Sequence, residues 1–594
     1  MTSPGRRFRP ERPGGGYSHL HVRSGFSYGL GTATPEELAR LAAEAGHGTL
    51  ALTDRDGLYG VPRFLAACGE AGLFPVVGAE ITVEVRGSNV PAGFARGHVV
   101  VLAASERGYR ALSRLLTAYL LPPEGSPWPS AAERRRPACG LGTLLERAGS
   151  GEAGGDLVCI TGAVPFGLVP SLALSKDNGL RGKSAEVLSL LREAFGRGNV
   201  YAEISDDGTE GSRTRMRAVE YLAGRCGVPT VATGEVTYLR PRDHRLSEAL
   251  AAARDLSPLP PPSYRPTDRL YLQPPGEMAR LFADRPEALR NAAEIARRCG
   301  GAVGLLGGFG RGVASLVPSA RLPEGETENG RLARLALAGA RKLYPAASRG
   351  EPDAFPSRAE LRSRLKKELG VISAMGYAGY FLIAREAVEI AHSLGTPVTG
   401  RGSAANSLVA RCLGLTTPDP FAHRLLFERF LHVGREDPPD VDLDFCSERR
   451  DAVRSELMRR HSAAGAAVAA TANTLSLRGA VRVAGRALGY SPSEVDALAR
   501  NVPRRIRDRD RLVRYESEWD AALSSPAMRG HPLQDRERFG LLLGLAEELE
   551  GRLHQPGTHL GGLVLGAAGM HLSESAPLEP SGTEGLVRVQ LDKD

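Results

Sequence analysis

Three aspartates alternate with apolar residues in the segment PDVDLDF, at positions 439–445. Side chains alternate across a β-strand, so Asp440, Asp442 and Asp444 would share one face while the apolar residues bury the other. Neighbouring carboxylates repel each other unless a cation neutralises them. Oxygen ligands without a histidine favour Mg²⁺, although a solvated edge strand or a Ca²⁺ site would show the same pattern. The segment therefore predicts a strand that can bind divalent cations.

A second segment suited to chemistry is GRGSAANS, at positions 400–407, which precedes an apolar run of helical character at 408–415. A turn of small residues can present backbone N–H groups and the Ser403 hydroxyl to a phosphate, with Arg401 as an added cation. Glycine-rich turns are common, so this segment is a weak signal on its own. Together with paired carboxylates, however, it indicates metal-assisted phosphoryl or nucleotidyl transfer.

The N-terminal part of the chain carries a different set of candidate ligands. His19 and His21 alternate on one strand face and could bind a metal, although two histidines at this spacing often occur by chance. Short apolar runs with β-strand character alternate here with amphipathic helical segments. The runs lie at 49–53, 74–78, 98–102, 157–160 and 229–232, and the helices at 35–45 and 215–226. Such a βα repeat predicts a barrel-like α/β domain, within a chain of the α/β multidomain class.

The composition fits a multidomain protein with real hydrophobic cores. The chain has 594 residues, of which 42% are hydrophobic, and its net charge is +8, a weak indication of a polyanionic partner. Its seven cysteines lie scattered without a CxxC pair, so neither a disulfide framework nor a zinc finger is predicted. No apolar run reaches transmembrane length, and residues 1–16 read as a disordered polar tail rather than a signal peptide. We therefore expect a cytoplasmic protein with no membrane partner.

Both chemical segments lie among further motifs whose order is informative. GYAGYFLI at 376–383 precedes the turn, and LLFERFL at 425–431 lies between the turn and the acidic strand. In this order the motifs resemble the bacterial C-family DNA polymerases, the family of the polymerase III α subunit. Asn406, where the replicative branch is expected to have glycine, resembles the error-prone, translesion branch, as does the ending with HLGGLV and VQLDKD. The resemblance extends over nearly the whole chain.

The resemblance implies a DNA-directed DNA polymerase that adds dNTPs to a primer 3′-OH by two-metal nucleotidyl transfer. Asp442 and Asp444 would hold two Mg²⁺ ions, while Asp440 would support them without binding the metal. Three residues of the turn would hold the triphosphate: Arg401, Gly402 and Ser403. The arginine has the alternative role of supporting the acidic strand.

Four arginines are candidates for contacts with the DNA backbone: Arg478, Arg482, Arg504 and Arg505. The first two lie on a helix that opens near 474–482, and the other two lie in a basic run at 503–511 that is interleaved with aspartates. A solvated face is an equally good interpretation of the first pair and the better interpretation of the second. The expected partners are primer-template DNA and dNTPs, and other replication or translesion proteins are left open.

The N-terminal part resembles the PHP (polymerase and histidinol phosphatase) domain that begins C-family polymerases. Four residues match positions that bind metals in intact PHP domains: His19, His21, Glu80 and His98. Arg55 stands where a histidine is expected, and its guanidinium cannot coordinate a cation and repels one. Further ligand positions have also departed from the family pattern, namely Leu30, Ala163, Asp207, Glu235 and Thr237, although Glu235 keeps a carboxylate. We therefore expect a vestigial site without Zn²⁺ or Mn²⁺, and no proofreading nuclease.

The predicted domains are a tail at 1–16, a PHP domain at 17–266, a helical connector at 267–321, a palm segment at 322–462, a helical thumb at 463–545 and a second palm segment at 546–594. The palm is expected to be of the β-type nucleotidyltransferase kind, with helices at 329–343 and 358–375. In the family, a third catalytic aspartate follows shortly after the segment that here lies at 590–594. We therefore expect that aspartate and the fingers domain to lie outside this sequence, and the chain alone to be inactive.

Three functions remain open at this point. The first is an error-prone, repair-associated DNA polymerase, of which this sequence is the N-terminal part. The second is a PHP-type metal phosphoesterase, which the lost ligands argue against and which phosphatase activity with added Mn²⁺ or Zn²⁺ would support. The third is a non-catalytic, DNA-binding pseudo-polymerase, which DNA binding without turnover would support.

Overall fold

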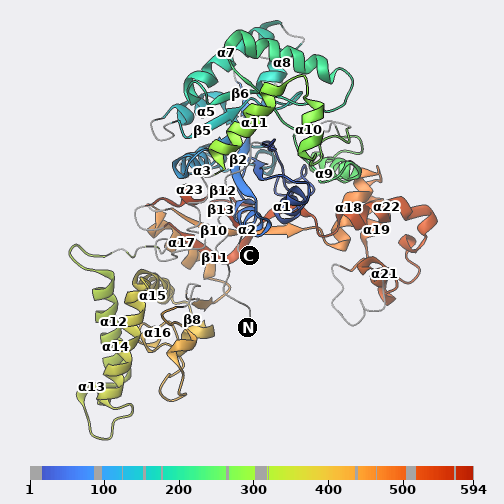
Figure 1. Cartoon of the computed structure of the whole chain (residues 1–594). Coiled ribbons are helices and arrows are strands. Elements are labelled where there is room, and N and C mark those ends of the chain that lie inside the picture. The colour runs from blue at the N-terminus through green and yellow to red at the C-terminus, as the bar shows by residue number, and fades with distance from the viewer. Residues whose placement is uncertain are drawn as a thin grey trace. The chain divides into compact units, whose positions relative to one another are not determined.

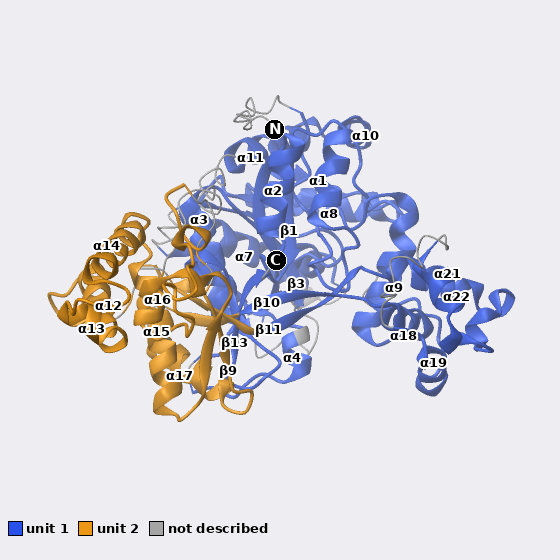
Figure 2. Cartoon of the chain, turned by 90° about the horizontal axis from the view of Figure 1, so that it is seen from below, with its two compact units in different colours: residues 1–305, 469–560, 573–594 blue, residues 306–468, 561–572 orange. Residues whose placement is uncertain are grey.

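The protein divides into two compact units in the computed structural model (Figure 2). Unit 1 comprises Met1–Leu305, Ala469–Leu560 and Ser573–Asp594, and unit 2 comprises Leu306–Val468 and Gly561–Leu572. The structure describes residues 16–592 except for positions 86–95, 124, 151–154, 176–177, 262–266, 301–317, 319, 321, 435–438, 440, 463–464, 504–516 and 567–569. Apart from Gly16, the predicted tail thus lies outside the described residues.

A seven-stranded sheet lies in the core of unit 1 (Figure 1). Its strand order is β1-β2-β3-β5-β6-β7, and the short strand β4 pairs with β2. The strands are β1 (Thr49–Arg55), β2 (Phe74–Glu84), β3 (Arg96–Ala103), β4 (Cys139–Gly140), β5 (Leu157–Ile160), β6 (Val200–Ile204) and β7 (Thr230–Ala232). The five predicted runs are confirmed as β1, β2, β3, β5 and β7, whereas β4 and β6 were not predicted.

The sheet is mixed rather than purely parallel. The pairs β1–β2, β5–β6 and β6–β7 are parallel, but β2–β3 and β3–β5 are antiparallel. A strict βα repeat would make every neighbouring pair parallel. Strand β3 therefore departs from the predicted repeat, although the α/β class of the domain is confirmed.

A short N-terminal segment links the two ends of this strand order. His19 forms a parallel bridge with Leu50 of β1, and Val22 forms one with Val236, shortly after β7. The segment therefore curls the sheet toward closure, as the predicted barrel-like domain requires. His19 and His21 lie in this segment, and both are completely buried.

Helices flank the strands of unit 1. Their bounds are α1 (Pro35–Glu44), α2 (Val61–Ala71), α3 (Glu106–Leu120), α4 (Ala131–Arg135), α5 (Leu141–Gly149), α6 (Leu168–Ala173), α7 (Asn178–Phe195), α8 (Ser212–Cys226), α9 (His244–Asp255), α10 (Pro275–Leu281), α11 (Pro286–Cys299), α18 (Leu477–Ala487), α19 (Pro492–Ala499), α21 (Glu518–Leu523) and α22 (Arg536–Leu549), with α23 (Leu572–Ser575) at its border. The predicted helices at 35–45 and 215–226 are confirmed as α1 and α8. Helix α1 begins where Thr34 and Glu37 form a capping box ahead of a proline.

A second hydrophobic cluster of unit 1 joins helices that are far apart in the sequence. Helices α18, α19, α21 and α22 occupy the range predicted as the thumb, and Trp519 and Phe539 are buried among them. Leu246 and Leu250 of α9, from the range predicted as the PHP domain, belong to the same cluster. Helices α9 and α18 lie side by side (Figure 1). Packing therefore joins the end of the predicted PHP range to the predicted thumb.

The C-terminal strands form a separate four-stranded sheet. Its order is β11-β10-β13-β12, with β10 (Ala466–Thr474), β11 (Leu553–Leu565), β12 (Leu578–Pro580) and β13 (Val587–Asp592). Gln590 of β13 accepts a hydrogen bond from the Leu58 backbone N–H at 2.8 Å and donates one to Glu579 at 2.9 Å. The Tyr59 hydroxyl also donates to Glu579, at 2.5 Å. The loop after β1 therefore holds the end of this sheet.

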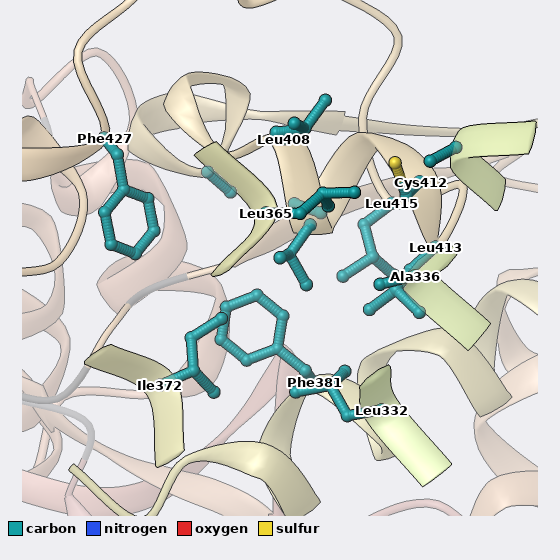
Figure 3. Close-up of a cluster of buried hydrophobic side chains, with 14 of the residues drawn as sticks. Leu332, Ala336, Leu365, Ile372, Phe381, Leu408, Cys412, Leu413, Leu415 and Phe427 are labelled. Carbon is teal, nitrogen blue, oxygen red and sulfur yellow. The ribbon is translucent and has the colours of Figure 1, made fainter. Parts of the chain in front are cut away.

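Most helices of unit 2 surround one apolar cluster (Figure 3). The elements of this unit are α12 (Glu328–Leu343), α13 (Pro345–Arg349), α14 (Arg358–Ala374), α15 (Ala378–Ser393), α16 (Leu408–Cys412), α17 (Arg450–Arg460), β8 (Val398–Arg401) and β9 (Asp442–Phe445). Leu332, Leu365, Ile372, Phe381 and Leu408 point into the cluster from four of these helices. Helix α17 packs against α15 in a smaller cluster. The helices predicted at 329–343 and 358–375 are confirmed as α12 and α14. No described helix has the length and apolar composition that a membrane crossing needs.

Candidate active site

The acidic segment forms the strand predicted for it. Strand β9 begins at Asp442 and pairs antiparallel with β8, so that Arg401 lies opposite Asp442 and Thr399 lies opposite Asp444. The side chains of Asp442 and Asp444 are 38% and 55% exposed. Both carboxylates are therefore accessible to a ligand from solvent.

The other face of β9 is apolar and packs against two helices. Leu443 and Phe445 contact buried residues of α15 and α17, namely Ala387, Ile390, Ala391, Val453 and Leu457. A slip of one residue would bury the carboxylates and expose these apolar side chains, so burial fixes the register of the strand. The predicted alternation of an acidic face and an apolar face is confirmed over Asp442–Phe445, whereas Asp440 lies outside the described residues.

The glycine-rich turn follows β8 directly and lies beside the acidic strand. Gly402–Asn406 forms a 3₁₀ turn, and Gly402 has φ +77°, in the left-handed region that favours glycine. A Cβ atom at Gly402 would lie 3.5 Å from Oδ2 of Asp442. Ser403 is half-buried, and its carbonyl accepts a hydrogen bond from the Asn406 side chain at 2.9 Å. The structure thus brings together the two segments that the sequence singled out.

The side chain of Arg401 joins the two carboxylates. Its Nη1 lies 3.1 Å from Oδ2 of Asp442, and its Nε lies 3.1 Å from Oδ2 of Asp444. The guanidinium thereby offsets the repulsion between the two acidic groups. Because this side chain is 62% exposed, its ion pairs are weak, and the arginine can leave for another anion.

The donor set fits Mg²⁺. Asp442 and Asp444 offer hard carboxylate oxygens on one strand face, which are the ligands that Mg²⁺ prefers. Gly402, which has no side chain, leaves the space next to Asp442 open. A bound cation would compete with Arg401 for the same carboxylates.

Replacing Arg401 by methionine should therefore strengthen metal binding by the nucleotide-free protein. We expect the Kd for Mn²⁺, measured by electron paramagnetic resonance, to fall by about fivefold, the worth of a weak exposed ion pair. Arg385→Met is the matched control, because Arg385 pairs with Glu389 on α15 rather than with the acidic strand. Equal Mn²⁺ affinity in the Arg401 variant and the control would show that Arg401 does not compete with the cation for Asp442 and Asp444.

The remaining polymerase candidates are only partly described. Three of them lie outside the described residues: Asp440, Arg504 and Arg505. Arg478 donates a hydrogen bond to the Val502 carbonyl at 2.8 Å, and Arg482 donates one to Asp496 at 3.4 Å. Both arginines thus have partners within the protein, and their contact with DNA stays a prediction.

Three of the four candidate PHP ligands meet in the interior of unit 1. One ligand atom each of His21, Glu80 and His98 lies within 4.8 Å of the other two, and all three residues are buried. His19 is not brought to this group, because its Nε2 donates a hydrogen bond to the Gln273 carbonyl at 2.9 Å.

Two guanidinium groups contact Glu80 in this pocket. Arg23 donates to Oε2 of Glu80 at 2.6 Å, and Arg55 pairs with Oε1. Arg23 is buried and also donates to Glu235 at 3.1 Å and to Thr237 at 3.0 Å. Both oxygens of Glu80 therefore already have cationic partners.

His21 is held between two glutamates. Its Nε2 bonds to Glu80 at 2.8 Å and its Nδ1 bonds to Glu203 at 2.7 Å. Burial and the charge of Arg23 lower the pKa of His21, but the charge of Glu203 and the hydrogen bonds to Glu203 and Glu80 outweigh them and raise that pKa to about 9. Burial lowers the pKa of His98 to about 3, and the Nε2 of His98 has no hydrogen-bond partner among the described residues. The two glutamates therefore favour a proton on His21, whereas burial disfavours one on His98.

This pocket does not fit a metal ion. Both oxygens of Glu80 are bound by the guanidinium groups of Arg23 and Arg55, and both ring nitrogens of His21 bond to glutamates. The sequence motifs did not indicate Arg23 or Glu203. Arg23 follows His21 by two residues on the same strand face, so the strand period was a signal that could have found it. Glu203 lies on β6, a strand that was not predicted.

Comparison with protein families divides the chain into two parts. Residues 19–207 match the PHP domain, and residues 331–594 match the family described as the bacterial DNA polymerase III alpha NTPase domain. Among solved structures, an amidohydrolase from Chromobacterium violaceum is similar over 37% of this chain and 88% of its own, at 18% identity. Its TM-score of 0.24 is too low to bear on the fold.

Curated relatives named error-prone DNA polymerase are similar over nearly the whole chain. The protein of Mycolicibacterium paratuberculosis is 33% identical over 582 residues, which are 97% of this chain and 48% of its own. The protein of Symbiobacterium thermophilum is 33% identical over 589 residues, 97% of this chain and 50% of its own. The chain thus spans about half the length of the curated relatives it matches. The resemblance found in the motifs is confirmed: the chain contains matches to the PHP domain and to the bacterial DNA polymerase III alpha NTPase domain, and it is similar to curated error-prone DNA polymerases.

Proposed function

We propose that this chain carries the nucleotidyl-transfer site of an error-prone, DNA-directed DNA polymerase associated with DNA repair. The proposal is supported chiefly by one observation, the pair of exposed carboxylates of Asp442 and Asp444 beside the Gly402–Asn406 turn. Its second support is the name of the curated relatives. Paired carboxylates next to a phosphate-binding turn are the parts that two-metal chemistry needs.

In this proposal Asp442 and Asp444 hold Mg²⁺, and Asp440 supports them. Bound Mg²⁺ would neutralise the triphosphate and lower the pKa of the primer 3′-OH. The primer oxygen forms a bond to the α-phosphorus of the dNTP, and pyrophosphate leaves. Gly402 and Ser403 hold the triphosphate through backbone N–H and hydroxyl donors. Arg401 moves from the carboxylates to a phosphate, for which its guanidinium is well suited.

The resemblance to C-family polymerases also assigns a role to each domain. Residues 322–462 and 546–594 would form a palm of the β-type nucleotidyltransferase kind, and residues 463–545 a thumb. Arg478 and Arg482 are the first candidates for contact with the backbone of primer-template DNA, and Arg504 and Arg505 are the weaker candidates, in a protein expected in the cytoplasm. Other replication or translesion proteins are left open as partners. The PHP pocket, filled by its own arginines, would serve the fold rather than a phosphoesterase reaction.

Primer extension tests the proposal. The chain, and the same chain extended through any coding sequence that follows in its reading frame, are incubated with primer-template DNA, Mg²⁺ and four dNTPs. We expect incorporation by the extended protein that follows the template base and stops when EDTA is added. Omitting the complementary dNTP is the matched control. Template binding without incorporation by either protein would replace the proposal with a non-catalytic DNA-binding role.

A further inference from the structure

A buried carboxylate holds the far end of the glycine-rich turn. Glu368 of α14 is completely buried. It accepts hydrogen bonds from the backbone N–H groups of Leu408 at 3.1 Å and Val409 at 3.0 Å, and from the hydroxyl of Ser407 at 2.8 Å. Glu368 therefore caps α16, the helix that begins where the turn ends.

Arg364, one helical turn before Glu368, completes this anchor. Its Nε donates to Glu368 at 3.0 Å. Its Nη2 donates to the carbonyl of Asn406 at 2.9 Å and to the carbonyl of Leu425 at 2.8 Å. The two side chains of α14 thus bind both the last residue of the turn and the first residues of the following helix.

This arrangement decides which donors are left for a phosphate. The first N–H groups of a helix have no partner within the helix and need acceptors from elsewhere. In α16 the N–H groups of Leu408 and Val409 are already bound to Glu368. The donors next to Asp442 lie at the opposite end of the turn, at Gly402 and Ser403.

The cost of burying a carboxylate indicates that Glu368 has a specific task. A buried charge is expensive unless hydrogen bonds and a counter-charge satisfy it. Glu368 accepts its hydrogen bonds from Arg364 and from the residues that follow the turn. An apolar side chain could fill the space of Glu368 without any of these bonds. A leucine at this position would fill the same space but would leave Leu408 and Val409 without acceptors.

We propose that Glu368 is a positioning residue for nucleotide binding. It acts through the turn: it holds the first N–H groups of α16 and thereby fixes Gly402 and Ser403 beside Asp442. Arg364 keeps Glu368 in place and holds the carbonyl of Asn406. The inference rests on the proposed function, because it assigns the ligand of the turn as a triphosphate.

Hydrogen exchange measured by mass spectrometry tests the anchor without any ligand. In the full chain carrying Glu368→Gln, we expect a peptide spanning residues 402–412 to exchange about tenfold faster, because the amide cannot replace both acceptor oxygens. Ile372→Ala is the matched control, since it removes packing from the same helix and cluster (Figure 3) without removing a hydrogen bond. Arg364→Lys, which keeps the charge but loses the fork between two carbonyls, should accelerate the same peptide less. Arg364→Lys replaces Glu368→Gln as the test variant if Glu368→Gln does not fold.

Binding of dATP with Mg²⁺ to the same proteins, measured by calorimetry, tests the role. We expect Kd to rise about tenfold in Glu368→Gln and to change little in Ile372→Ala, while the affinity for primer-template DNA stays the same in both. Equal exchange in wild type and Glu368→Gln, or equal weakening of dATP binding in the Ile372 control, would overturn the inference. A wild-type chain that binds no dATP would overturn the proposed function and the nucleotide role with it, whereas exchange would still show whether Glu368 fixes the turn.

Discussion

Replacing Asp444 by asparagine is expected to reduce nucleotide incorporation by about a thousandfold or more, because a lost metal ligand removes several kcal/mol of transition-state stabilisation. Asp442→Asn should have an effect of the same size. Asparagine has the same shape as aspartate, so Leu443 and Phe445 keep the strand in its register. The fold should therefore survive, and only the charge and the anionic ligand are lost.

The measurement is the rate of primer extension at saturating dNTP by the protein extended through the coding sequence that follows, together with the Kd for Mn²⁺ of the nucleotide-free chain. Asp451→Asn is the matched control, because Asp451 is an exposed aspartate of the same unit that pairs with Arg450 and Arg454 rather than with Arg401. We expect the control to retain wild-type rates. Incorporation within tenfold of wild type in both Asp442 and Asp444 variants would show that the metal ligands lie elsewhere.

The acidic strand was predictable because its information is local. A strand period of two and one buried face decide where Asp442 and Asp444 point, and both are visible in seven consecutive residues. The same holds for the glycine-rich turn, in which Gly402 adopts a positive φ that the sequence implies through its residue type. The chemistry assigned to both segments came from the family resemblance rather than from these patterns.

Long-range pairing accounts for what the sequence did not reveal. Strand β6 has the buried Glu203 at an inward position, where local pattern expects an apolar residue. The partner that makes this burial tolerable is His21, 182 residues away. Glu368 is a second case, since it lies among charged neighbours on α14 and becomes a buried cap only through the amides of Leu408 and Val409. The direction of β3 is a third, because strand direction is set by connections and not by side-chain pattern.

The second large effect is expected at Arg23. Replacing Arg23 by methionine should lower the free energy of unfolding of unit 1 by about 3–5 kcal/mol, the usual cost of removing one partner from a buried ion pair. The side chains of Arg23, Glu80 and Glu235 are 5%, 0% and 2% exposed, so water cannot replace the lost guanidinium. Glu80 keeps its ion pair with Arg55, so the loss of Arg23 affects Glu235 more than it affects Glu80.

Tryptophan fluorescence can follow this unfolding in the full chain. Both tryptophans of the sequence, Trp128 and Trp519, belong to unit 1, so the signal reports that unit alone. Arg40→Met is the matched control, because Arg40 forms an exposed pair with Glu44 on α1, in the same unit. The control should change the free energy of unfolding by less than about 0.5 kcal/mol.

A second substitution separates the charge of Arg23 from its bulk. Adding Glu235→Gln to Arg23→Met removes the charge of one carboxylate that has lost Arg23, and should recover about 1–3 kcal/mol of the free energy of unfolding. If the pocket needed only a filled volume, methionine alone would suffice and Glu235→Gln would give no recovery. An Arg23→Met protein as stable as the Arg40 control would therefore mean that the arginine is not the cation on which this pocket depends. Recovery of stability by Glu235→Gln would mean instead that the guanidinium of Arg23 neutralises the buried carboxylates of this pocket.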